Sequence, residues 1–218
     1  MSQVKISGNA SGTGIFTIAS PNGNTDRTLT LPDATTTVVG TDATQTLTNK
    51  TLSTGLVMGV STITSGTAVA STSGTSIDFT SIPSWAKRIT VAMQTVSTNG
   101  SSNYLLRIGN SSVTTSGYAS VMNYVNPGAN SCTGTSDATG FILSKDVNSS
   151  TSLTATCTLV LLSSGFYVFS FVGNNGVNGA GYFGSGLLNL GSTLDRVRIT
   201  TINGTDTFDT GSINILYE

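Results

Sequence analysis

The sequence predicts an all-β fold in which a short, trimeric β-shaft precedes an antiparallel, jelly-roll-like β-sandwich. Thr is β-branched and fits a pleated strand, and it occurs 38 times among the 218 residues. The 31 Ser and 25 Gly residues suit the turns between strands. Apolar residues alternate with polar ones in many short runs, and no stretch keeps a helical periodicity. Short strands joined by turns are therefore expected along the chain.

Residues 75–218 are predicted to form the sandwich, because strand-like runs follow one another there at the spacing typical of such folds. Turn residues separate the runs. The strand-like runs are 76–80, 88–96, 104–108, 118–125, 140–144, 154–162, 166–172, 187–190, 196–201 and 212–217.

Alternation within these runs assigns residues to the two faces of each strand. Ile89, Val91 and Met93 are expected to point inward, with polar or small residues between them pointing outward. The runs 158–162 and 166–172 are apolar on both sides. This pattern indicates central strands that are covered on one side by the core and on the other by a neighbouring subunit.

Residues 27–74 are predicted to form an oligomerising β-shaft. Short strands with one sparse apolar edge are not stable alone in water, so their partners must be other copies of the chain. Three copies wound around a common axis would bury the apolar residues and pair the exposed backbone edges. A disordered Thr/Ser linker is the alternative, because low-complexity polar tracts are often unstructured. The residues expected in the trimer contact are Leu29, Leu31, Val38, Leu47 and Leu52.

The charge of the chain is low and evenly distributed. Nine basic and ten acidic residues leave a net charge of -1 without a run of either sign, which disfavours nucleic acid and anionic lipid as partners. The first residues do not form an apolar secretion signal, and no apolar run reaches the about 18 residues of a membrane span. We therefore expect synthesis in a cytosol, where Cys132 and Cys157 stay free thiols.

No enzymatic activity, cofactor or metal site is predicted. The chain contains no His, the commonest general base, and its single Glu is Glu218. Glycoside hydrolysis needs two carboxyl groups that flank a cleft, whereas the acidic residues here lie in turns or at strand starts. Asp206 and Asp209 offer oxygen atoms to calcium, but the preceding Asn203-Gly204 pair favours a turn followed by a strand.

Three segments carry a resemblance to a known family. Residues 27–52 read RTLTLPDATTTVVGTDATQTLTNKTL, residues 76–90 read SIDFTSIPSWAKRIT and residues 194–217 read LDRVRITTINGTDTFDTGSINILY. The first resembles a segment that recurs in bacteriophage tail fibre and tail spike proteins, and the others resemble the terminal domain of phage fibre proteins. The resemblance implies a homotrimeric virion appendage, made in the host cytoplasm. Residues 1–26 would then attach it to a phage tail or baseplate protein.

Host attachment by binding a polysaccharide of the bacterial surface is the function predicted for residues 75–218. The segments 126–136 and 173–184 are expected to be loops, and their Asn, Ser and nearby Tyr residues suit the hydroxyls and faces of a glycan. They also suit ordinary loops or subunit contacts. A head fibre or capsid decoration protein with a purely structural role is the alternative function. The residues predicted to contact the receptor are Tyr124, Asn126, Asn130, Asn174, Asn175, Asn178 and Tyr182.

Overall fold

A computed structural model describes residues 8, 10–15, 17, 19, 22–26, 28, 63–129, 131–177 and 179–218. The chain divides into two compact units, Met1–Leu56 and Val57–Glu218, and every strand among these residues belongs to the second. The described residues contain no helix, so the all-β prediction is confirmed. The residues predicted for the trimer contact lie outside the described part of the chain: Leu29, Leu31, Val38, Leu47 and Leu52.

Two sheets make up the second unit. The larger sheet contains β1 (Thr64–Ser65), β2 (Val69–Ala70), β4 (Arg88–Thr98), β7 (Ala119–Asn126), β8 (Ser131–Asp137), β10 (Leu153–Ser163), β11 (Phe166–Asn175), β12 (Gly181–Asn189) and β14 (Phe208–Tyr217). The smaller sheet contains β3 (Ser76–Phe79), β5 (Tyr104–Asn110), β6 (Ser112–Val113), β9 (Phe141–Ile142) and β13 (Arg196–Thr201).

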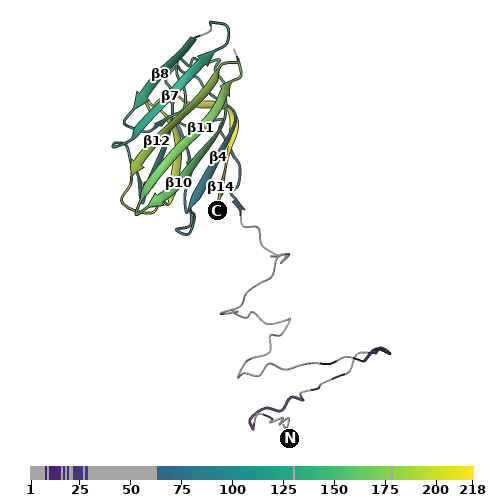
Figure 1. Cartoon of the computed structure of the whole chain (residues 1–218). Helices are drawn as coiled ribbons and strands as arrows, with labels where there is room; N and C mark the ends of the chain where they lie inside the picture. Colours follow the sequence, from purple (N-terminus) through teal and green to yellow (C-terminus); the bar gives the residue numbers. More distant parts are fainter. Residues whose placement is uncertain are drawn as a thin grey trace. The chain divides into compact units, whose positions relative to one another are not determined.

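All the strand pairs in both sheets are antiparallel, as predicted. The larger sheet has the order β1-β14-β4-β10-β11-β12-β7-β8, with β2 also paired to β14. The smaller sheet has the order β3-β13-β5-β6, with β9 paired to β5. Figure 1 shows the long strands of the larger sheet side by side across one face of the second unit.

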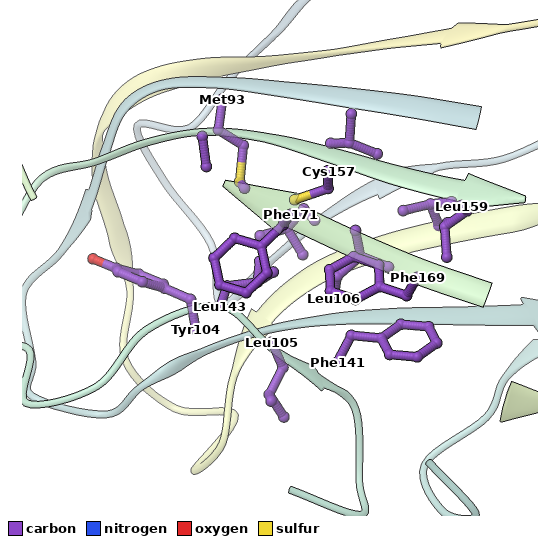
Figure 2. Close-up of a cluster of buried hydrophobic side chains, with 14 of the residues drawn as sticks. Met93, Tyr104, Leu105, Leu106, Phe141, Leu143, Cys157, Leu159, Phe169 and Phe171 are labelled. Carbon is purple, nitrogen blue, oxygen red and sulfur yellow. The ribbon is translucent and has the colours of Figure 1, made fainter. Parts of the chain in front are cut away.

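Apolar side chains from both sheets form one core between them. In β4, Ile89, Val91 and Met93 are buried, as their alternation with other residues predicts. Phe141 of β9 stacks on Phe169 of β11, with ring centroids 4.4 Å apart and an interplanar angle of 11°. Figure 2 shows both rings within the buried cluster. Because this contact joins the smaller sheet to the larger one, the sheets pack face to face as a β-sandwich.

The two cysteines are free thiols in different surroundings, in agreement with the expectation from the sequence. Cys157 lies in β10 and is buried in the core, where Figure 2 places it beside Met93 and Phe171. Burial disfavours the thiolate and raises the pKa of the Cys157 thiol far above its usual value. Cys132 is exposed on β8.

Among the longer strands of the larger sheet, β8 and β12 depart most from the predicted extents. β8 falls in a segment expected to be a loop, and most of its side chains are exposed or half-buried, so no apolar alternation marks it as a strand. β12 begins at Gly181, whereas the sequence predicts a strand only from residue 187. Its glycines conceal the pattern. A Cβ at Gly184 would lie 2.6 Å from Phe171 and one at Gly186 would lie 2.7 Å from Phe141, so close packing excludes side chains there.

The larger sheet also includes residues from the range predicted for the shaft. β1 and β2 both pair with β14, where Thr64 lies opposite Tyr217 and Val69 lies opposite Ile213. Each strand has only two residues, which is too short for an alternation to be recognised in the sequence. The compact unit begins at Val57, and the predicted boundary at residue 75 lies inside it.

Removal of one ring from the contact between the sheets is expected to destabilise the sandwich strongly. Phe169→Ala would leave a cavity against Phe141 and should lower the free energy of unfolding by about 3–5 kcal/mol. Val177→Ala is the control, because Val177 is exposed in a turn, and it should cost less than about 0.5 kcal/mol. Urea unfolding followed by circular dichroism at one fixed protein concentration measures both. Similar costs for the two variants would contradict the described core.

Candidate functional site

The two segments predicted to bind a receptor lie next to each other at one end of the larger sheet. Each is mostly strand and only its turn is a loop: one turn joins β7 to β8, and the other joins β11 to β12. β7 pairs with β12 so that Tyr124 lies opposite Tyr182 and Val125 lies opposite Gly181. The turns that follow β7 and precede β12 are therefore neighbours. We call this end of the sheet the turn end.

The chain enters the sandwich at the opposite end. Thr64 of β1 lies opposite Tyr217, near the end of β14, and Arg88 at the start of β4 forms an ion pair with Glu218. Strand β14 then runs the length of the sheet, and Phe208 at its other end lies opposite Thr98. Figure 1 shows the C-terminus at one end of the second unit and the connection between β7 and β8 at the other. The turn end is thus the end farthest from the first strand.

Asparagine side chains fix both turns. The Asn126 Oδ1 accepts a hydrogen bond of 3.0 Å from the backbone N–H of Gly128. The Asn175 Oδ1 accepts one of 3.0 Å from the backbone N–H of Val177. Both are Asx turns, in which a side-chain oxygen binds a backbone donor two residues further on. Asn175 is only 4% exposed, so its side chain supports the turn from inside the protein.

The two predicted tyrosines form a tilted pair under the turn end. Their ring centroids lie 5.5 Å apart, and Tyr124 is half-buried whereas Tyr182 is only 1% exposed. The Tyr182 hydroxyl donates to the backbone carbonyl oxygen of Lys145 at 3.3 Å. Burial raises the pKa of Tyr182 to about 12, and a hydrogen bond with the Asn175 side chain opposes this shift. Tyr182 therefore holds two loops together from below the surface.

The seven residues predicted to bind a receptor thus occupy different positions. Tyr182 and Asn175 are buried, so their side chains do not form the surface of the turn end. Tyr124 and Asn126 are half-buried, and Asn174 is exposed. Asn130 and Asn178 lie outside the described residues.

A third loop at the turn end is held by Asp206. Its carboxylate accepts hydrogen bonds from the Ser102 backbone N–H at 2.8 Å and from the Asn203 side-chain amide at 2.6 Å. The Asn203 Oδ1 also accepts from the backbone N–H of Thr205 at 3.0 Å. A Cβ at Gly100 would lie 2.1 Å from the Asp206 carboxylate, so a side chain there would displace the carboxylate. The carboxylate therefore joins two loops, as the turn interpretation of this segment implies.

Among the described residues, no three His, Cys, Asp or Glu side chains gather in a way that suits a metal ion. No helix in the same part of the chain has the length and hydropathy needed to cross a membrane. No family model, curated protein or solved structure that was compared with the chain matches it.

Exposed apolar residues on the larger sheet are a further surface feature, and the sequence prediction did not identify Val121 and Leu187 among them. Val121 of β7 and Leu187 of β12 point away from the core, as do Val168 and Val172 of β11. The apolar character of the run 166–172 on both sides indicated part of this surface. The contribution of β7 and β12 depends on their register, which no local pattern specifies.

Alkaline pH is expected to weaken the turn end. The unfolded chain releases the Tyr182 proton near the usual pKa of 10.0, whereas the folded protein holds it to about 12. The free energy of unfolding therefore falls as pH rises from about 10 to about 12, by about 2–3 kcal/mol in total for this group. Tyr182→Phe has no proton to lose and should decline less steeply.

Urea unfolding of both proteins at pH 8 and at pH 11.5 measures this difference. Tyr118 is also buried with a pKa of about 12, and it contributes equally to both proteins. The same loss of stability in the variant and the unaltered protein would show that Tyr182 is not held in its neutral form.

Proposed function

We propose that this chain is a subunit of a homotrimeric bacteriophage tail fibre that attaches the virion to the host cell. In this proposal the segment before Val57 contains a trimeric β-shaft and the attachment to a tail or baseplate protein. The jelly-roll-like sandwich then carries the receptor-binding surface at its turn end. The receptor is a polysaccharide of the bacterial surface.

The observation that carries this proposal is the polarity of the sandwich. The chain enters at the end where Thr64 lies opposite Tyr217, and two adjacent hairpin turns lie at the other end. A domain with this polarity carries its turns at the end opposite its own first strand. Loops on a rigid β-scaffold are where binding residues are commonly found. The resemblance of residues 27–52 to phage fibre segments supports the same placement.

The chemistry of the turn end suits an uncharged ligand rich in hydroxyl groups. The exposed amide of Asn174 offers two donors and one acceptor carbonyl, and the half-buried ring of Tyr124 offers an apolar edge. Asn126 and Asn175 hold the backbone of the turns, which lowers the entropy lost on binding. Three such ends in one trimer would bind a repeating polysaccharide with an avidity far above that of one end.

Binding of the purified full chain to immobilised lipopolysaccharides and capsular polysaccharides from a panel of bacteria tests the proposal. We expect tight binding to a narrow subset of the panel. Asn174→Ala should weaken it about tenfold, equivalent to about 1.4 kcal/mol for each lost polar contact. Ser163→Ala is the control, because Ser163 is exposed at the opposite end of β10, and it should bind as the unaltered protein does.

Failure to bind any member of the panel, or equal weakening by both substitutions, would contradict the assignment of the receptor surface to the turn end. Antibody labelling of purified virions addresses the placement of the protein. Label on the tail is expected. Label on the capsid would favour the alternative of a head fibre or decoration protein.

A further inference from the structure

The side of the larger sheet that faces away from the core carries no charged side chain over five adjacent strands. These strands are β10, β11, β12, β7 and β8, all described in full. Cross-strand partners show which residues share this side: Val160 lies opposite Val168, which lies opposite Leu187. We call this surface the outer face. Its exposed apolar side chains are Val121, Val125, Val160, Leu162, Val168, Val172, Phe183 and Leu187, and Thr, Ser, Asn, Ala, Cys and Gly residues fill most other positions.

The exposed apolar side chains fall into two groups with a pair of serines between them. Val172 is opposite Phe183, and the two are 64% and 45% exposed. Two residues along the same strands, Ser170 lies opposite Ser185, and after two more Val168 lies opposite Leu187. Neighbouring residues on one face of a sheet are in side-chain contact. Exposed apolar side chains that gather on one face of a sheet are typical of surfaces that bind a partner.

The smaller sheet has a different outward side. Asp78 of β3 pairs with Arg198 of β13 through two hydrogen bonds of 2.6 and 2.9 Å. Arg107 of β5 lies opposite Arg198 and donates to the Thr139 backbone carbonyl at 2.7 Å. Charged side chains therefore lie across the outward side of the smaller sheet, whereas Arg88 of β4 and Asp137 of β8 lie at the borders of the outer face. This difference indicates that water covers the first side and that the outer face has a protein neighbour.

A shallow groove of about 700 Å³ crosses the part of the outer face that lies away from the turn end. Val121, Val168 and Leu187 line it together with Ser185. Asp137 is its one acidic lining residue, and the carboxylate already accepts hydrogen bonds from the Thr139 backbone N–H at 2.5 Å and from the Thr139 hydroxyl at 2.6 Å. The groove therefore suits an apolar, uncharged protrusion of the partner.

We infer that the outer face packs against another copy of this chain, except at its rim by the turn end, where Asn174 of β11 stays open. The inference rests on the proposed homotrimer and names the surface through which its sandwiches meet. A partner for an uncharged face must itself lack buried, unpaired charge, because desolvating a lone charge is costly. The chain supplies such a surface in every copy, and a shaft that joins three copies would hold these surfaces at high local concentration.

The size of the face fits this role. Five strands about 4.8 Å apart, each about nine residues long at about 3.3 Å per residue, give roughly 700 Å². Stable protein interfaces bury about 800 Å² on each partner. The apolar residues of the face are spread over this area, as expected for the centre of an interface between identical subunits.

Protection of a thiol introduced in the outer face tests the inference. Val172→Cys is made in the full chain with Cys132→Ser, so that the buried Cys157 is the other thiol present. Ser112→Cys in the same background is the control, because Ser112 is exposed on β6 of the smaller sheet. The reaction of each assembled protein with a thiol-specific chromogenic disulfide is followed over time. We expect the thiol at position 172 to react at least about tenfold more slowly than the thiol at position 112.

Adding Leu187→Glu to the Val172→Cys protein places a charge in the same face and should raise the reaction rate at position 172 to that at position 112. Equal rates at the two positions before this change, in a protein whose measured mass is that of a trimer, would overturn the inference and leave the trimeric fibre standing. A protein that stays monomeric at all concentrations would overturn the proposed trimer together with it.

Discussion

A sheet of nine strands has two sides, and a sheet of five strands covers only one of them. The rest of this structure depends on that inequality. On the covered side, large side chains such as Phe141 and Phe169 stack across the gap between the sheets. On the other side, β10 and β11 present Thr, Ser and Val, which tolerate water but do not require it. A surface of that kind can be stable in a folded chain and still gain free energy when another apolar surface covers it.

Packing between the two sheets also determines where the turns lie. β12 packs beneath Phe141 and Phe171 through Gly184 and Gly186, and the close approach fixes its position in the sheet. The register of β12 with β7 then brings the two hairpin turns together at one end. The buried side chains of Tyr182 and Asn175 support that end from inside the protein. The position of the turn end is therefore set by packing deeper in the sheet.

A strand could be predicted from the sequence where buried and exposed residues alternate along it. The burial of a residue could not be predicted where it depends on strands that are distant in the sequence. The alternation marked β13 in full and β4 except for its last two residues, because one side of each strand is buried. β8 has no such contrast, since most of both its sides are open to solvent. In the candidate site, Asn174 and Asn175 are adjacent in sequence, yet one is exposed and the other buried. Tyr182 is also buried, although the residues around it in the sequence are typical of a loop.

A low content of charged residues, the apolar outer face and the shaft proposed for the segment before Val57 all fit a chain that works as a trimer. Sedimentation equilibrium of the purified full chain, from nanomolar to micromolar concentration, tests this claim most directly. The account predicts one species with three times the chain mass, stable to dilution and to added salt, because apolar contacts and not ion pairs join the copies. A single species with the mass of one chain at micromolar concentration would contradict it.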